Sequence, residues 1–123
     1  MSRDIKITFE KLSILATLNN SSTSDKLWKK LPIESSVSTW GEEIYFSIPI
    51  NDVEENAKSV VDLGDLAFWP PGSAFCLFFG QTPVSSEGAI KPASPVNVIG
   101  KVLGDIEPLK SVISGEKVKI EKA

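Results

Sequence analysis

Apolar residues are densest between Gly64 and Pro83, and their pattern predicts two neighbouring strands. Residues 66–69 and 74–79 are apolar runs too short for helices, and Pro70-Pro71-Gly72 separates them, so we predict strands joined by a tight turn. Alternation divides the second strand into two faces, with Phe75, Leu77 and Phe79 on one and Ala74, Cys76 and Phe78 on the other. Because both faces are apolar, we expect a central strand that is covered on both sides.

The rest of the chain also favours short strands over helices. Alternating or apolar segments predict further strands over residues 5–9, 12–18, 33–39, 42–50, 96–103 and 118–120. Two short helices are predicted, at 23–31 with Ser22 as its cap and at 106–112 with Asp105 as its cap. Gly100 suits a close approach or a bulge. About eight strands and two short helices predict a mainly β fold, a closed barrel.

Composition narrows the possible partners. A chain of 123 residues predicts a single domain over residues 1–123. The formal charge of −3, without a basic stripe, predicts that nucleic acid is not a partner. The first residues contain no apolar signal segment, and no run approaches the roughly 18 apolar residues of a membrane span. With its single cysteine, the chain cannot form an internal disulfide. We therefore expect a cytoplasmic protein with no membrane partner.

The chain has no histidine, which removes whole classes of chemistry. Ser-His-Asp and Cys-His catalysis are impossible, as are zinc or iron sites with histidine ligands. Arg3 is the only arginine, so clamps that need a guanidinium group are nearly excluded. We expect neither a metal nor a cofactor.

Two segments carry a resemblance to a known family. Gly72-Ser73-Ala74-Phe75, followed by Thr82-Pro83, resembles the Gly-Ser-Gln-Phe-Phe strand and Thr-Pro loop of cyclophilins, the peptidyl-prolyl isomerases. Val96 to Val102 is similar to their His-Val-Val-Phe-Gly-Lys-Val strand. As a whole, the chain looks closer to a small prokaryotic cyclophilin-like family of unassigned function, through Trp40 to Phe46 and the Gly-Asp-x-x-x-Trp-Pro-Pro-Gly block. The resemblance implies an eight-stranded barrel capped by two helices.

The isomerase residues are not preserved in this resemblance. Cyclophilins place an arginine in a Phe-His-Arg strand, whose nearest counterpart here is Ile44-Tyr45-Phe46-Ser47. Their pocket phenylalanine falls on Cys76, and their pocket histidine falls on Val96. The resemblance therefore implies the barrel without its catalytic set, and catalysis is not expected.

The match suggests a candidate groove. It places Trp69 and Phe78 on the outward, pocket-side face of adjacent strands, unless the helices simply cover them. Cys76 shares the face of Phe78 by alternation. Further candidates are Trp40 and Tyr45, which would either rim the groove or pack in the core, and Gln81, which would either bind a ligand backbone or face solvent.

Acidic residues are not expected to catalyse. Glu42-Glu43 and Glu54-Glu55 are adjacent in sequence, so their side chains diverge, and we interpret both pairs as solvated charge. Asp65 is interpreted as a turn former.

Three functions remain open. The first is a non-catalytic cyclophilin-like binding module for an extended or proline-bearing peptide or a small apolar ligand. The second is a weak peptidyl-prolyl isomerase acting through shape and desolvation. The third is an accessory subunit of a larger amide-hydrolysing enzyme, because barrels of this shape occur in such assemblies.

Overall fold

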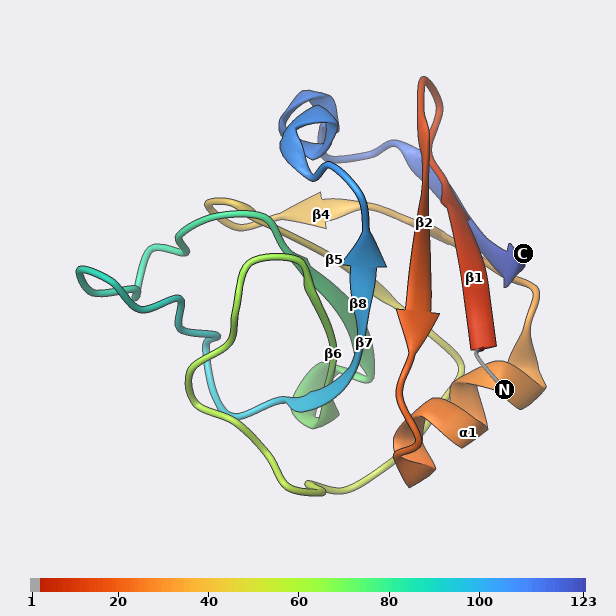
Figure 1. Cartoon of the computed structure of the whole chain (residues 1–123), viewed down its shortest axis with the longest axis horizontal. Helices are drawn as coiled ribbons and strands as arrows, with labels where there is room; N and C mark the ends of the chain where they lie inside the picture. Colours follow the sequence, from red (N-terminus) through yellow and green to blue (C-terminus); the bar gives the residue numbers. More distant parts are fainter. Residues whose placement is uncertain (1–2) are drawn as a thin grey trace.

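A computed structural model describes residues 3–123, and in that range nine antiparallel strands form one sheet that curls into a nearly closed barrel (Figure 1). The strands are β1 (Arg3–Thr8), β2 (Ser13–Leu18), β3 (Ile33–Ser36), β4 (Ser38–Thr39), β5 (Glu43–Ser47), β6 (Asp65–Trp69), β7 (Ala74–Phe78), β8 (Asn97–Leu103) and β9 (Lys117–Lys122). Their spatial order is β3-β9-β1-β2-β8-β6-β7-β5-β4. The mainly β barrel predicted from the sequence is confirmed.

The strand count differs from the prediction because residues 33–39 form two strands. β3 pairs with β9, whereas β4 pairs with β5 at the other end of the sheet. Val37 lies between them, and its backbone N–H and C=O bond to Glu116 and Gly115, each at 2.8 Å. The segment thus changes partner at Val37 and connects the two ends of the sheet.

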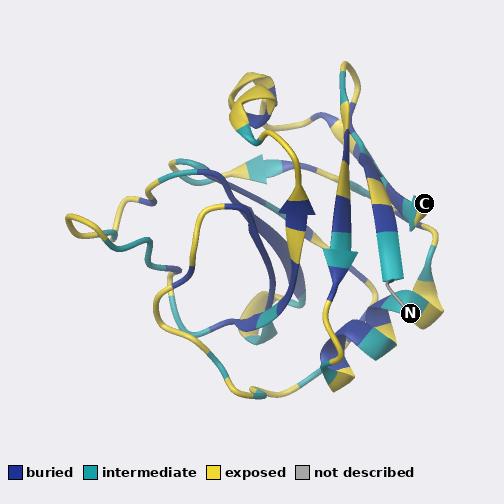
Figure 2. Cartoon of the chain, in the orientation of Figure 1, coloured by how far each residue is buried: buried dark blue, intermediate teal, exposed yellow. Residues whose placement is uncertain are grey.

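The barrel interior holds the apolar face predicted for the central strand. Phe75, Leu77 and Phe79 all belong to the main core. Phe75 pairs in register with Phe46 of β5, and their rings stack with centroids 5.1 Å apart. Every residue of β7 is buried, which confirms a strand covered on both sides (Figure 2).

One α-helix and a 3₁₀ turn lie at opposite ends of the barrel (Figure 1). α1 (Ser22–Lys30) begins one residue before the predicted helix, because the Ser21 hydroxyl, not that of Ser22, accepts the Ser24 N–H. The second short helix predicted over residues 106–112 is present as a 3₁₀ helix, η2 (Glu107–Ser111). No helix within residues 3–123 is long and apolar enough to cross a membrane.

The predicted bulge at Gly100 is confirmed. β6 pairs with Gly100 at Leu66 and then with Val98 at Ala67, so Ile99 is an extra residue on β8. A Cβ at Gly100 would lie 2.2 Å from the Thr17 carbonyl oxygen. The bulge lets Ile99 and Val102, three residues apart, both point into the core.

Two loops cover the outer face of β6 and β7. Residues 48–64 and 79–96 join there through isolated bridges between Lys58 and Val96 and between Val61 and Ile90. Beneath them is a second apolar cluster, which we call the outer cluster: Val61, Ala67, Ala74, Cys76, Phe78 and Val96. The prediction considered helices as the cover for this face, but loops form it.

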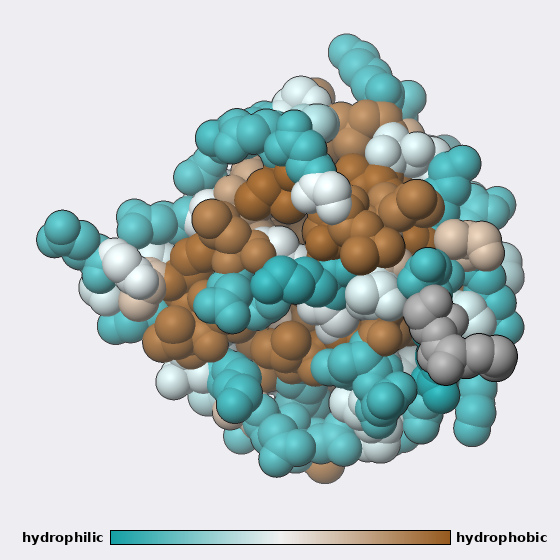
Figure 3. Space-filling model, in the orientation of Figure 1, coloured by the Kyte–Doolittle hydropathy of each residue, from teal (hydrophilic) through white to brown (hydrophobic). Residues whose placement is uncertain are grey.

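Exposed apolar residues also occur away from these loops. Leu15 of β2 and Leu103 of β8 are cross-strand partners and are 49% and 45% exposed. Figure 3 shows apolar side chains gathered on the face that carries these two strands. This patch is therefore on a different part of the barrel wall from the outer cluster.

Candidate ligand-binding pocket

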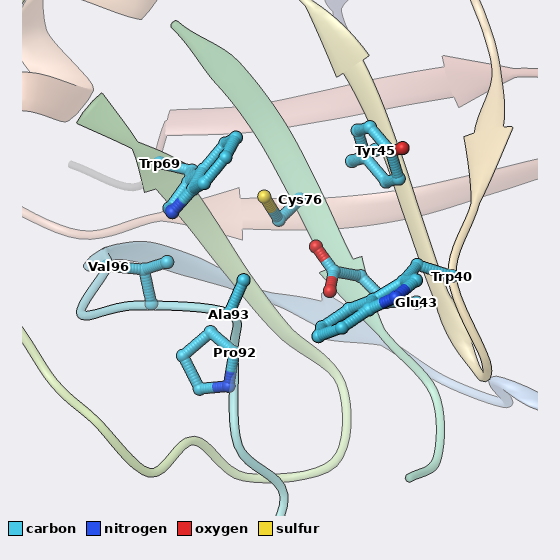
Figure 4. A pocket seen from close by; sticks show the side chains of 8 residues that line it. All are labelled: Trp40, Glu43, Tyr45, Trp69, Cys76, Pro92, Ala93 and Val96. Carbon is cyan, nitrogen blue, oxygen red and sulfur yellow. The ribbon is translucent and has the colours of Figure 1, made fainter. Parts of the chain in front are cut away.

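A pocket of about 160 Å³ opens on the outer face of β5, β7 and β6. Cys76 of β7 lies at its centre, with its register partner Tyr45 on β5 and Trp69 on β6 beside it (Figure 4). The remaining lining residues are Trp40, Glu43, Pro92, Ala93 and Val96. Three aromatic side chains therefore border one small cavity.

The Trp69 ring is held from two directions. Its Nε1–H donates to the Ser94 hydroxyl at 2.7 Å. On the other side, the turn η1 (Pro70–Gly72) passes so close that a Cβ on Gly72 would lie 2.6 Å from Trp69 Cζ3. The tight turn predicted between the two strands is thus a 3₁₀ turn, and its glycine leaves room for the tryptophan.

A hairpin turn places Trp40 and Glu43 on the pocket. The Trp40 N–H donates to the Glu43 carbonyl at 2.9 Å, and the Glu43 N–H donates back at 3.2 Å. Between them Gly41 has a φ of +59°, and a Cβ there would meet the Gln81 carbonyl oxygen at 2.9 Å. Only glycine combines this conformation with this close approach.

Glu43 is a buried acid inside the pocket. Its residue is 6% exposed, and Figure 4 shows the carboxyl group between Cys76 and Trp40. Burial raises the pKa of Glu43 to about 7, and a hydrogen bond from the Cys76 thiol offsets part of this rise. No Lys or Arg within residues 3–123 forms an ion pair with Glu43.

The interpretation of Glu43 as solvated charge was wrong. The two acids do diverge as predicted, and Glu42 leans over Gly80, 4.0 Å from the Lys110 ammonium. Glu43, however, pairs with Phe78 on the same outer face as Tyr45. Alternation with the inward-facing Ile44 could have revealed this position from the sequence.

Cys76 is a buried thiol that stays neutral near pH 7. It is 2% exposed, and burial followed by the neighbouring Glu43 carboxylate raises the pKa of the thiol well above its usual range. Because the thiolate is the nucleophile, this cysteine is not activated for catalysis.

Four of the predicted site residues meet in the pocket, namely Trp40, Tyr45, Trp69 and Cys76. Phe78 does not: it is fully buried in the outer cluster, beneath Val61 and Ile90. Gln81 is exposed and borders a separate depression of about 420 Å³ beside Glu42. Besides Glu43, the sequence analysis did not select Pro92 and Ala93, because loop residues show no periodicity, whereas Val96 lies where the resemblance placed the pocket histidine of cyclophilins.

Two other acids have structural roles. The Glu55 carboxylate keeps the solvent contact that the sequence predicted and also accepts hydrogen bonds from the backbone N–H groups of Ser22 and Thr23 at the start of α1. A hydrogen bond from the Ser22 side chain, followed by the backbone bonds from Thr23 and Ser22, lowers the pKa of Glu55. Asp65 accepts the Asp62 N–H at 2.9 Å, which agrees with a turn former.

The only arginine is occupied elsewhere. Arg3 on β1 forms an ion pair with Asp25 of α1. No lysine or arginine lines the pocket. Residues 3–123 also contain no group of three or more acidic or cysteine side chains placed to hold a metal ion.

Comparison with known proteins agrees with this barrel. A family model described as "Cyclophilin-like" matches residues 3–121. The chain belongs to the cyclophilin-like family. It is also similar to the solution structure of the hypothetical protein AF2241 from Archaeoglobus fulgidus, with 43% sequence identity and a TM-score of 0.85. That match covers 99% of this chain and 95% of the other. No curated protein matches the chain.

Proposed function

We propose that this cyclophilin-like protein is a non-catalytic binding module that holds one compact apolar group of its ligand, such as a proline ring in an extended peptide. The observation that carries the proposal is the aromatic pocket formed by Trp40, Tyr45 and Trp69. Its volume of about 160 Å³ is close to that of an apolar cavity of about 150 Å³ known to bind benzene. A single five- or six-membered ring therefore fits.

The size of the pocket also limits the ligand. Sites that enclose a whole drug-sized molecule have volumes of roughly 300–1,000 Å³. This pocket is smaller, so a larger ligand would insert one group and leave the rest outside. That behaviour suits recognition of a residue within a peptide better than storage of a large cofactor.

Absence of catalysis is supported by the pocket's composition. Prolyl isomerisation proceeds without covalent chemistry, so an enzyme contributes mainly electrostatic stabilisation of the twisted amide. One well-placed donor is worth roughly 3–4 kcal/mol, or about two to three decades in rate. Arg3 is paired with Asp25 away from the pocket, and no cationic side chain of residues 3–123 lines it. A protease-coupled proline assay should therefore show no cyclophilin-like turnover.

Binding can be tested by NMR with the three indole N–H signals of the protein. A proline-containing peptide and its alanine-substituted counterpart would be titrated into labelled protein. Trp40 and Trp69 line the pocket, whereas Trp28 packs against the core from α1 and serves as an internal reference. We expect the proline peptide to shift the first two signals and leave Trp28 unchanged.

Matched variants sharpen the test. Trp69→Leu removes a pocket wall, and Trp28→Leu makes the same chemical change outside the pocket. We expect at least tenfold weaker peptide binding for the first variant and unchanged binding for the second. Equal binding of both peptides, or shifts confined to Trp28, would contradict the proposal.

A further inference from the structure

Glu43 lacks the partner that a buried acid normally has. Buried carboxylates are usually paired with a cation or with several hydrogen-bond donors. Here the residue is 6% exposed, no ion pair reaches it within residues 3–123, and its side-chain partner is the weakly donating Cys76 thiol, whose one proton also has the Ala74 carbonyl oxygen as an acceptor at 3.9 Å. An acidic group is thus held in the pocket with its charge uncompensated by the protein.

Several of the other pocket groups are not placed to donate a hydrogen bond to an anion or a carbonyl group. The Trp69 indole N–H is already bonded to Ser94, and Pro92 has no N–H to offer. In Figure 4 the Tyr45 hydroxyl lies on the side of the ring away from Cys76. Aromatic rings, in contrast, attract cations through the negative potential of their faces.

From this combination we infer that the pocket selects a compact organic ammonium group, with Glu43 as the counter-charge and Trp40, Tyr45 and Trp69 as the surrounding aromatic wall. The inference rests on the proposed binding function and narrows the chemical class of its ligand: a proline ring carries the required charge only as the N-terminal residue of a peptide, because the nitrogen of an internal proline is an uncharged amide. A volume of about 160 Å³ admits a trimethylammonium or pyrrolidinium group. Both groups present an apolar surface to the rings and a positive charge to the acid.

Ammonium binding should depend on pH through Glu43. A bound cation favours the ionised acid, so affinity should rise as pH increases through the pKa of about 7 in the free protein. One linked proton gives about a tenfold gain between pH 6 and pH 8. A neutral ligand that accepts a hydrogen bond from the protonated acid would show the opposite dependence.

Other titratable groups near Glu43 do not produce the same effect. On β7 the Cys76 thiol stays neutral across this range, because its pKa is raised. The pocket residue that shares β5 with Glu43 is Tyr45. The loop of residues 79–96 adds only the apolar residues Pro92, Ala93 and Val96 to the lining. No charged side chain contributes to the Glu43 shift.

The nearest acids have other neighbours. Glu42 leans over Gly80 toward Lys110 of η2. Burial raises the pKa of Asp65 on β6, with an opposing hydrogen bond from the Asp62 N–H, but Asp65 is not among the residues that line the pocket. The pH dependence is therefore assigned to Glu43.

The test compares choline with 3,3-dimethylbutan-1-ol, which has nearly the same shape and no charge. Indole N–H shifts of Trp40 and Trp69 would report binding of each probe at pH 6 and pH 8. We expect choline to bind at least tenfold more tightly than the alcohol at pH 8. Choline affinity should fall about tenfold at pH 6, while that of the alcohol stays constant.

Glu43→Gln keeps the shape of the side chain and removes its charge, and Glu42→Gln is the adjacent control outside the pocket. Glu43→Gln should still bind the alcohol but should lose the preference for choline and the pH dependence of choline binding. Glu42→Gln should retain the preference and the pH dependence. Binding of the alcohol without a choline preference would overturn the ammonium inference and leave the binding function standing. Binding of neither probe and of no proline peptide would overturn both.

Discussion

At the residue scale, the burial of Glu43 links the pocket to the stability of the protein. Its pKa is raised from 4.5 to about 7 by removal of the carboxyl group from water. The folded state therefore holds the proton more tightly than the unfolded state. Stability contributed by the protonated form is present below about pH 4.5 and is lost as pH rises through about 7.

Substituting Glu43 with Gln should remove this loss. A pKa difference of this size corresponds to about 3 kcal/mol in the free energy of unfolding. Denaturant unfolding should show that stability decreases less from pH 5 to pH 8 in Glu43→Gln than in the parent. At pH 8 the variant should be the more stable of the two proteins. A Glu42→Gln control should behave like the parent. Identical pH dependence in parent and Glu43→Gln would show that the acid is not buried as described.

Gly72 is a second residue whose effect can be isolated. A methyl group there would meet the Trp69 ring at 2.6 Å, so Gly72→Ala should displace that ring from the pocket wall. We expect a changed Trp69 indole signal and roughly tenfold weaker ligand binding. Gly80→Ala is the control, because its methyl group would displace the Glu42 side chain, which lies outside the pocket. Parent-like affinity of Gly72→Ala would contradict this role.

At the element scale, alternation and the two apolar faces predicted the facing of β7 and its burial on both sides, whereas the elements that cover its outer face depend on contacts that no local pattern contains. The split between the core face of Phe75 and the outer face of Cys76 follows directly from the period of two. Loops 48–64 and 79–96 have no such period, so their bridges over Phe78 were not predictable. Likewise, Val37 changes pairing partner through long-range bonds, and Ser21 and Ser22 are equally good caps by sequence.

The covered position of Phe78 changes its expected contribution to stability. If Phe78 formed an open groove wall, its substitution would lower the free energy of unfolding only slightly. Phe78 is instead fully buried. Phe78→Ala should therefore cost about 3–5 kcal/mol, comparable with Phe75→Ala in the barrel core. Hydrogen exchange of the Val61 N–H, which bonds to the Ile90 carbonyl at 2.9 Å, should accelerate in Phe78→Ala relative to Phe75→Ala. A loss below about 1 kcal/mol in denaturant melts would show that the loops do not seal this cluster.

At the scale of the whole molecule, a cyclophilin-like barrel carries a pocket of aromatic rings and one buried acid in place of the isomerase residues. The family resemblance located the barrel and the positions of Trp69 and Cys76, since these lie in the best-matched segments. The resemblance gave no reason to select Glu43. This acid is buried only because β5, β6, β7 and residues 92–96 come together around it in the folded chain. The sole arginine, Arg3 of β1, pairs with Asp25 of α1 and not with the pocket, so the pocket offers binding surface without the isomerase donor.

Modification of Cys76 tests the central claim, an open pocket that binds a ligand, most directly. This is the only cysteine in the chain, and it lines the pocket, so a small thiol reagent reports on a single site. We predict that native protein reacts slowly, because the thiol is neutral, but faster than it unfolds. Choline or a proline peptide should slow the reaction in proportion to pocket occupancy. Modification that proceeds only at the unfolding rate and is unaffected by either probe would contradict the account.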